Sequence, residues 1–579
     1  MGEESSQTKN YWRWSKQDFF PEQSFQSWNT YTTAISQTGS RFKDRFFDRS
    51  TETNELEVLP KQSENGLKKC LTWWDLIWLS FGAVVGTGIF VLTGQEAHNH
   101  AGPAIVVAYV ISGMSAMLSV FCYTEFAVEI PVAGGSFSYL RVELGDFIAF
   151  IAAGNILLEA VVGAAGLARS WTSYFATLIN HQPDFLRIHV SSFADGFNLL
   201  DPLAVVVLIV TSSIPMFGTR IASSFNWITS VLTALLILFV IVAGFVKADT
   251  SNLTPFFPNG ANGVFQASAV LFWAYTGFDM IATMAEETKK PAKDIPIGLV
   301  GSMTMITLVY CLMALSLSTM QKYSEMDVNA AFSVAFQSVG MKWAKYIVAV
   351  GAIKGMTTGL MVGALGQGRY TTQIARSHMI PPWFALVHPK TGTPVNATLL
   401  VTITSACVAF FSSLDVLSSV SSFSTLFIFM LMAVALLVRR YYVKDITSRS
   451  HLYKLLFLMA TIICSSIGTT VYYNLSHGGW IGHAITLPIW FLGTLGIAFL
   501  PQQRVPKLWA VPLVPWLPST SIMINVFLIG ALGKDATIRF GICTLIMLLY
   551  YVFFGLHATY DVAHQKTNDL ETLKGSGSS

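Results

Sequence analysis

The stretch FGAVVGTGIFVLTG, residues 81–94, decides how this chain crosses a membrane. It lies in an apolar run of about 20 residues, which is long enough to span a bilayer. Its middle, however, holds Gly82, Gly86, Thr87 and Gly88. Glycine weakens a helix, and an unsatisfied backbone group in lipid costs several kcal/mol. A span broken at this place therefore needs another partner for its backbone groups.

The composition of the whole chain indicates many membrane spans. Hydrophobic residues make up 53% of the 579 residues, and charged residues make up 12%, about half the charged fraction of a soluble domain. Fourteen apolar segments reach spanning length: 74–93, 103–125, 146–178, 199–217, 223–246, 263–286, 296–320, 343–371, 394–412, 413–438, 453–474, 483–500, 513–532 and 535–557. We therefore expect an all-α integral membrane protein.

The distribution of charge predicts the orientation of these spans. An even number of spans places both termini on one side, and the connections on that side carry most of the Lys and Arg residues, so both termini are expected in the cytoplasm. This divides the chain into a cytoplasmic tail, two groups of five spans, four further spans and a second tail: 1–70, 71–246, 247–444, 445–557 and 558–579. The final GSGSS resembles an appended linker and is left out of the reasoning.

A second interrupted span supports a functional reading of the first. FWAYTGFD, residues 272–279, lies five spans after the first break and is again polar and glycine-bearing in mid-membrane. Interrupted segments in corresponding positions of two halves point to a transporter binding site between inverted repeats. Either glycine cluster alone is equally typical of close helix packing.

The broken segments predict a site for an amino acid head group. Backbone N–H groups at the start of a half-helix suit a carboxylate, and carbonyls at the end of the preceding half-helix suit an ammonium group. The N–H donors would be Gly86, Thr87 and Gly88, and the carbonyls those of Val84, Val85, Trp273, Ala274 and Thr276. Carboxylate beside ammonium is the part that all α-amino acids share.

Longer motifs identify a family resemblance. GAVVGTGIF with GFDMIATMAEETKKPAKDIPIG (277–298) resembles the amino acid–polyamine–organocation superfamily. CYTEFAVEIPVAGGSFSYLRVELGD (122–146), KGMTTGLMVGALGQGRYTTQIARSHMIPPW (354–383) and LVRRYYV (437–443) resemble plant cationic amino acid transporters, over residues 68–563. The resemblance implies a leucine-transporter-like fold of 5+5 inverted repeats with four added spans, fourteen in total. It also implies transport by alternating access, of cationic or neutral amino acids.

The resemblance assigns roles to individual residues. Thr87 and Gly88 would meet the substrate carboxylate. The carbonyls of Val84, Trp273, Ala274 and Thr276 would meet its amino group. Phe278 matches an aromatic residue that closes over the substrate from outside, with a packed core phenylalanine as the alternative. Gly277 and Gly82 would permit the breaks. Gly363 matches a position where a small residue leaves room for a long side chain, although helix packing explains it equally well.

Two acidic residues within predicted spans, Glu159 and Asp279, match positions of the family pattern. Glu159 matches an acidic position that faces the substrate, and an ionisable residue in the membrane is a functional candidate by default. It would receive a cationic side chain, hold a water or carry a proton; an internal pair with Arg169 is the alternative. Asp279 also matches the family pattern, and either substrate contact or support of the broken span accounts for it.

The sequence departs from the family where bacterial relatives hold a lysine in span 5. Thr233 stands at that place, and Lys354 supplies a different intramembrane cation, one turn before Thr357 and Thr358. We expect the Lys354 ammonium to replace a bound sodium ion, to tie span 8 to the broken span 1 and to take part in proton coupling. The alternative is a lysine that snorkels to the interface.

Other functions find little support in the sequence. No metalloprotease, P-loop or nucleophile-elbow motif is present, so no enzymatic activity, cofactor or metal is expected. His98 and His100 are expected to be loop histidines rather than a metal pair. Expected partners are the amino acid, protons and membrane lipids, with no nucleic acid. The sequence leaves the oligomeric state open. It also leaves open the alternative that the chain is an amino acid sensor with the same fold. The plasma membrane is the expected location, with the vacuolar membrane as the alternative. The 1–70 tail carries aromatic and basic residues. It is either flexible or in contact with the inner leaflet or the cytoplasmic face of the protein.

Overall fold

The computed structural model describes residues 11, 15–48, 71–85, 88–130, 135–194, 196–217, 219–279, 288–389, 391–444, 446–476 and 480–564. Gly86 and Thr87 therefore lie outside the described residues. The first half holds α2 (Lys16–Phe19), η1 (Gln23–Phe25), α3 (Trp28–Ser36), α4 (Thr38–Lys43), η2 (Asp44–Asp48), α6 (Trp73–Val84), α7 (Gly88–Glu96), η3 (Ala97–Ala101), η4 (Gly102–Ala104), α8 (Ile105–Glu129), α9 (Gly135–Leu144), α10 (Asp146–Leu178), β1 (Ile188–His189), β2 (Leu199–Leu200), α11 (Pro202–Phe217), α12 (Thr219–Val246) and η5 (Thr250–Leu253).

The second half holds α13 (Gly260–Leu271), η6 (Phe272–Tyr275), α15 (Pro291–Met320), η8 (Tyr323–Glu325), α16 (Ala331–Ser338), α17 (Lys342–Arg376), η9 (Pro382–Ala385), α18 (Val395–Phe411), α19 (Leu414–Tyr441), α20 (Arg449–Ser476), α21 (Ile481–Ala498), α22 (Trp516–Ala531), α23 (Gly533–Tyr550) and η10 (Tyr551–Gly555). A helix lies over each of the fourteen apolar segments. Strands β1 and β2 form one short antiparallel ladder in a loop. The expected all-helical fold is confirmed.

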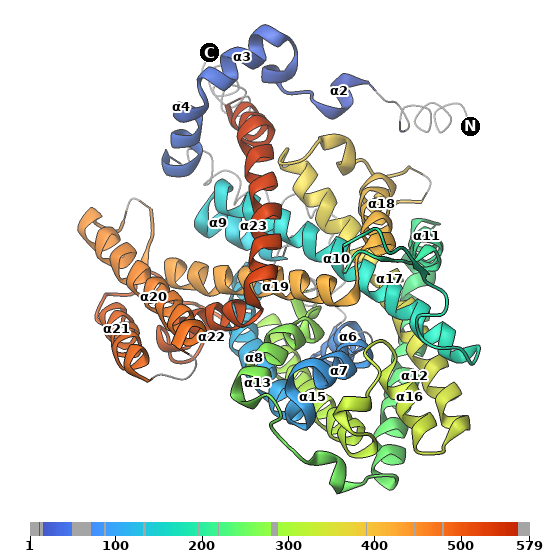
Figure 1. Ribbon diagram of the computed structural model, residues 1–579. Coiled ribbons are helices and arrows are strands. Elements are labelled where there is room, and N and C mark those ends of the chain that lie inside the picture. The colour runs from blue at the N-terminus through green and yellow to red at the C-terminus, as the bar shows by residue number, and fades with distance from the viewer. Residues whose placement is uncertain are drawn as a thin grey trace, which may run out of the picture.

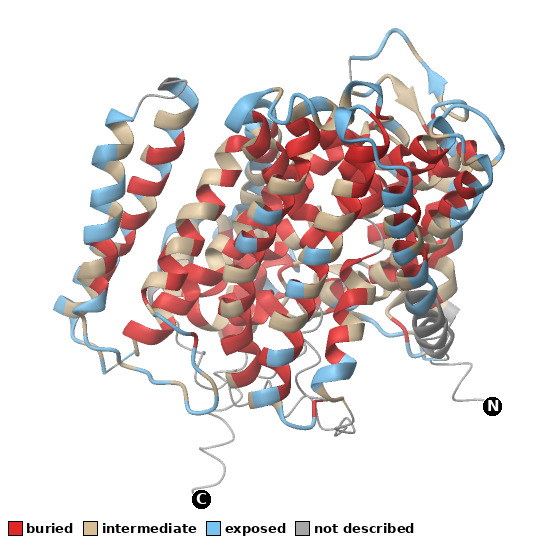
Figure 2. Cartoon of the chain, turned by 90° about the horizontal axis from the view of Figure 1, so that it is seen from below, coloured by how far each residue is buried: buried red, intermediate tan, exposed pale blue. Residues whose placement is uncertain are grey.

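Eight helices in the described part of the chain are long and apolar enough to cross a membrane, and four shorter apolar helices accompany them. The number of fourteen crossings stays a prediction. Buried residues gather in the middle of the bundle, and exposed residues lie around its perimeter (Figure 2). Many of the exposed side chains are large and apolar, such as Phe457 on α20 and Leu492 on α21. Such a perimeter suits lipid rather than water.

Both expected breaks are present in the backbone. Helix α6 ends at Val84, Val85 is extended, and α7 begins at Gly88. Helix α13 gives way to the 3₁₀ turn η6, after which Thr276 is extended and Gly277 has a positive φ of 107°. Positive φ favours glycine at this position.

The two broken segments pack directly against each other. A Cβ on Gly88 would overlap with Ala274, and a Cβ on Gly277 would lie 3.2 Å from the carbonyl oxygen of Ala83. Any larger residue would push the segments apart. Glycine at Gly88 and Gly277 therefore serves close backbone approach as well as the break itself.

Two of the family motifs, 122–146 and 437–443, meet in buried ion pairs. Arg440 of LVRRYYV donates to Glu125 at 2.7 Å, and Arg439 donates to Glu143 at 2.5 Å. Glu125 lies in the last turns of α8 and Glu143 lies on α9, so the end of α19 is held to both helices. Buried charges need such partners because an unpaired charge in a low-dielectric interior is very costly. These motif positions are explained by structure rather than by substrate contact.

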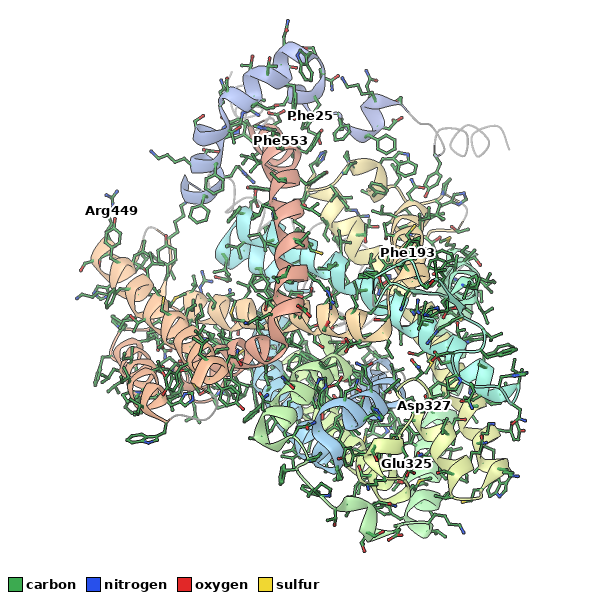
Figure 3. All side chains as sticks on the ribbon, in the orientation of Figure 1. Phe25, Phe193, Glu325, Asp327, Arg449 and Phe553 are labelled. Atoms are coloured by element: carbon green, nitrogen blue, oxygen red, sulfur yellow. The ribbon has the colours of Figure 1, made fainter. Side chains whose placement is uncertain are left out.

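The N-terminal tail is docked on the protein. Figure 1 shows α3 and α4 lying over the end of α23. The ring of Phe25 stacks on Phe554 at 6.1 Å, in the region where Figure 3 labels Phe25 and Phe553. The backbone N–H of Ser24 donates to Asp561 at 2.7 Å, and Arg41 pairs with Asp561 at 3.2 Å. Arg45 pairs with Asp146 at the start of α10. The described part of the tail therefore contacts the protein's own face, one of the alternatives that the sequence left open.

Candidate functional site

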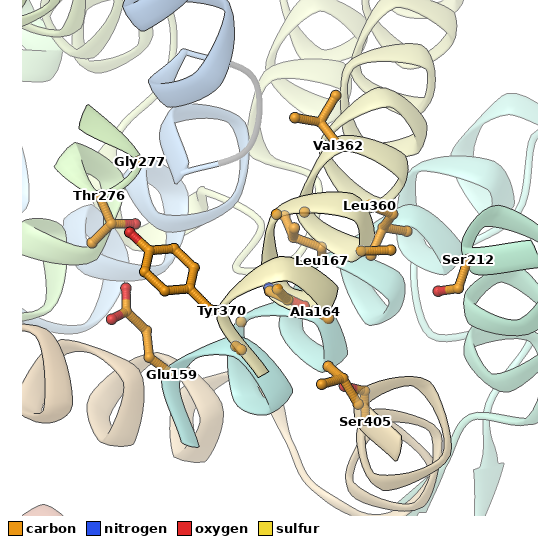
Figure 4. A pocket seen from close by; sticks show the side chains of 18 of the residues that line it. Glu159, Ala164, Leu167, Ser212, Thr276, Gly277, Leu360, Val362, Tyr370 and Ser405 are labelled. Atoms are coloured by element: carbon orange, nitrogen blue, oxygen red, sulfur yellow. The ribbon is translucent and has the colours of Figure 1, made fainter. Parts of the chain in front are cut away.

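A cavity of about 180 Å³ lies where the broken segments face α10 and α17. This volume is below that of pockets for drug-sized ligands, about 300–1,000 Å³, and it suits a small metabolite. Gly82 and Ala83 line it from α6, Thr276 and Gly277 from the second break, and further residues from α10, α11, α17 and α18. Figure 4 shows the Tyr370 hydroxyl reaching toward Thr276 and Glu159, while Ser212 and Ser405 lie at the other side.

The charged side chains that line this cavity are both acidic. Glu159 projects from α10 and Asp279 follows the second break, and no Lys or Arg is among the described lining residues. Thr425 of α19 lies close to Glu159, although its hydroxyl donates to the Ser421 carbonyl at 3.0 Å. The Tyr370 hydroxyl donates to Asp279 at 3.5 Å. Two carboxylates in one enclosed space favour a cationic ligand, because a nearby positive charge offsets their cost of burial.

The alternative partner for Glu159 is occupied elsewhere. Arg169 lies on the same helix but donates to the carbonyl oxygens of Ala409 at 2.8 Å and Leu199 at 2.9 Å. The Arg169 guanidinium therefore contacts the C-terminal end of α18 and strand β2 rather than Glu159. The Glu159–Arg169 pair that the sequence left open is not formed in this structure.

A tyrosine on α15 joins the two broken segments. The buried Tyr310 hydroxyl lies 3.1 Å from the carbonyl oxygen of Val84 and 2.9 Å from that of Ala274. Val84 is the last residue of α6, where helix carbonyls lack partners within the helix. These are two of the carbonyls expected to meet the substrate ammonium. Each carbonyl has a second lone pair, so Tyr310 positions them without occupying them fully.

The second break also satisfies part of its own backbone. The Thr276 hydroxyl and the Thr276 N–H both bond the Trp273 carbonyl, at 2.9 and 3.1 Å. Val85 is buried beside the first break but does not line the cavity. The head-group assignments stay predictions, and the donors Gly86 and Thr87 lie outside the described residues.

Of the two aromatic residues Trp273 and Phe278 at the second break, Trp273 borders the cavity. Its ring packs on α10 where two glycines make room: a Cβ on Gly166 would lie 3.0 Å from the ring, and one on Gly163 would lie 3.6 Å from it. Phe278, in contrast, is fully buried, packs against the rings of Tyr123 and Phe429, and is absent from the cavity lining. In this structure Phe278 therefore has the core position that was the alternative.

The four residues expected near the place of a sodium ion, Lys354, Thr233, Thr357 and Thr358, lie in three different environments. Lys354 and Thr233 come together in an apolar groove of about 670 Å³ between α12 and α17, and no hydrogen-bond partner reaches the buried Lys354 ammonium among the described residues. Thr357 accepts from the Trp171 indole at 2.9 Å. Thr358 instead lines the central cavity. Among the described residues, which leave out Gly86 and Thr87 of the first break, no hydrogen bond ties Lys354 to that break.

Gly363 faces open space in the cavity. A Cβ there would meet only the Gln367 amide, at 3.7 Å, so packing does not require a glycine at this position. Sequence reasoning missed Tyr310, Tyr370 and Gln367. Gln367 follows Gly363 by one helical turn on α17 and Tyr370 follows it by two turns, a periodicity that could have found them. For Tyr310 the sequence carries no local signal.

Comparison with known proteins gives consistent results. An amino acid permease profile matches residues 71–500, and a profile for the C-terminus of such permeases matches residues 509–559. The chain is 66% identical to the Arabidopsis thaliana protein named cationic amino acid transporter 8, vacuolar, covering 97% of this chain and 95% of the relative. It is 66% identical to cationic amino acid transporter 5 of the same plant, covering 96% and 98%. The methylthioribose transporter of Bacillus subtilis is 34% identical, covering 78% and 97%.

Proposed function

This chain belongs to the amino acid permease family, and we propose that it carries cationic amino acids, such as arginine and lysine, across a membrane. One observation carries the choice of substrate: Glu159 and Asp279 line an enclosed cavity in which no described Lys or Arg balances their charge. A bound monocationic amino acid has an α-ammonium and a side-chain cation, and it places two positive groups near two carboxylates. Relatives at 66% identity are named for the same substrate class.

The head group would bind at the two breaks. The N–H group of Gly88, the first residue of α7, would receive the carboxylate together with those of Gly86 and Thr87, which precede it in the sequence. Carbonyls next to the breaks would receive the α-ammonium, in positions that Tyr310 holds. The substrate side chain would extend past Gly363, where the absence of a side chain leaves open space. Trp273 would cover the bound substrate in place of the expected Phe278.

Transport would follow alternating access around the broken segments. We propose fourteen spans, with spans 1–5 and 6–10 as inverted repeats and both termini cytoplasmic. A membrane potential of 100 mV supplies about 2.3 kcal/mol per charge, which is enough to concentrate a monocation without protons. A neutral substrate such as glutamine would need proton coupling.

Uptake by proteoliposomes tests the substrate class. Purified full-length protein should accumulate labelled arginine in a saturable way when the potential is inside-negative, and Glu159→Gln should lower arginine uptake at least tenfold. Ser419→Ala is a matched control, because Ser419 lies on α19 outside the cavity lining and its hydroxyl only returns to the Val416 carbonyl. Saturable binding without accumulation would indicate a sensor, and equal arginine uptake by Glu159→Gln would refute the role of the carboxylate.

We propose the plasma membrane as the location. The name of one relative includes the word vacuolar, so the vacuolar membrane is the competing address. A fluorescent fusion expressed with markers for both membranes in plant cells distinguishes them, and fluorescence confined to the vacuolar membrane would refute the proposal.

A further inference from the structure

A polar cluster at the end of α7 lies outside the central cavity and has no role in the proposed substrate site. Glu96, the last residue of α7, is fully buried. Its carboxylate is 2.9 Å from Nδ1 of His100 and accepts from the Gln95 amide at 3.0 Å. A carboxylate at this depth needs such partners to stay charged. The expectation that His100 is merely a loop histidine is therefore wrong.

The cluster connects two helices that are far apart in the sequence. The same Gln95 amide nitrogen lies 3.4 Å from the Asp415 carboxylate and 3.3 Å from the Ser418 hydroxyl, both on α19. Two carboxylates, Glu96 and Asp415, thus share one amide that has only two protons. A proton bound in the cluster, on His100 or on one of the carboxylates, reduces their repulsion further.

The cluster is open to protons although Glu96 is buried. Asp415 is exposed, and the His100 side chain is 31% exposed. Histidine exchanges protons near neutral pH, so the pair Glu96–His100 leads from solvent to a buried carboxylate. With the N-terminus on the cytoplasmic side, as proposed above, this end of the first span faces outward.

The other charged and titratable groups near Glu96, His100 and Asp415 do not bond to these three residues in the described part of the chain. The Asp327 carboxylate, before α16, is turned to its own loop and accepts from the N–H groups of Asn329 and Ala330. Helix α13 and helix α16 present no acidic or basic residue. His98 on η3 has a buried Nδ1 without a hydrogen-bond partner among the described residues, and the Tyr109 hydroxyl bonds Thr93.

We propose that Glu96, His100 and Asp415 form a proton-binding site that controls the contact between α7 and α19. Helix α7 begins at the first break, and α19 carries Thr425, which touches Glu159. Loss of the proton leaves the carboxylates of Glu96 and Asp415 on the single Gln95 amide, and their repulsion separates the outer ends of α7 and α19. Binding of the proton brings the two helices together again. The cluster thereby links external pH to the opening of the cavity. This inference rests on the proposed transport function.

The test measures arginine uptake by proteoliposomes while only the external pH changes, with the potential clamped. In the unmodified protein the apparent Km should change about tenfold between about pH 5.5 and 7.5, within the usual range of allosteric coupling. Glu96→Gln, His100→Asn and Asp415→Asn should each flatten this dependence. His98→Asn is the matched control and should retain it, because among the described residues the buried Nδ1 of His98 has no hydrogen-bond partner, on α19 or elsewhere.

A second readout separates this proposal from the transport function. The melting temperature of the full-length protein in detergent, measured from about pH 5.5 to 7.5, should shift with pH in the unmodified protein and less in Glu96→Gln. This readout holds even if arginine is not the substrate. An unchanged pH dependence of both uptake and melting in Glu96→Gln, or its equal loss in His98→Asn, would overturn the proton site.

Discussion

The link between Tyr310 and the two broken segments gives the sharpest prediction. Tyr310→Phe keeps the buried ring, which packs against the rings of Tyr109 and Tyr275, and removes only the hydroxyl. The hydroxyl lies within hydrogen-bond distance of two buried carbonyls, those of Val84 and Ala274. Its loss leaves at least one of them without its donor.

The expected size of the effect follows from this geometry. An acceptor left unsatisfied in a protein interior costs about 1–3 kcal/mol. The segments that Tyr310 joins are those that would hold the substrate head group, so part of the cost appears in binding. At about 1.4 kcal/mol for each factor of ten, the apparent Km for arginine should rise about tenfold. The melting temperature should also fall, because the link exists without substrate.

Tyr275→Phe is the matched control in the same ring cluster. Tyr275 is equally buried, and its hydroxyl donates at 2.9 Å to the Tyr109 carbonyl. That carbonyl lies inside α8, where it also accepts a bond within the helix, so no orphan acceptor results. We expect a smaller loss of stability and an unchanged Km. Uptake assays and thermal unfolding of both variants test this prediction. An apparent Km of Tyr310→Phe equal to that of the unmodified protein would refute the reasoning. Equal changes of Km and melting temperature in the two variants would refute it as well.

Four further outcomes are expected. Gly166→Leu should abolish uptake, since its side chain would displace the Trp273 ring; normal uptake would show that the ring moves freely. Gly363→Met should lower arginine uptake more than alanine uptake, measured by competition, because it fills open space in the cavity. Asp561→Ala should cost about 3–5 kcal/mol of stability by breaking a buried pair, and an unchanged melting temperature would argue against a docked tail. Lys354→Met should alter the pH dependence of uptake if the lysine takes part in coupling; normal uptake at every pH would exclude that role.

The sequence predicted the helices well because each span leaves a local signature. The run from 146 to 178 is continuous and apolar, and α10 covers those residues. The breaks at Gly88 and Gly277 were also visible, because glycine in mid-membrane contradicts the surrounding pattern. Glu159 was identified for the same reason, since a carboxylate within an apolar run stands out, and the structure places it in the cavity.

Other features depended on packing between distant segments. Phe278 and Trp273 are both aromatic and lie five residues apart in the second break, so composition did not tell which one borders the cavity. Tyr310 is one aromatic among many in an apolar span. Tyr310 follows Val84 by 226 residues in the sequence, but in the fold its hydroxyl lies 3.1 Å from the Val84 carbonyl oxygen.

The sequence alone determined that this chain is a bundle of membrane helices with two paired breaks and an acidic residue inside a span. These properties follow from hydropathy and helix propensity, which act locally along the chain. Only the tertiary structure decided which groups meet: Tyr310 with both breaks, Trp273 with the glycines of α10, and Glu96 with His100 and α19. Such contacts arise from the relative placement of whole helices, and no local pattern encodes that placement.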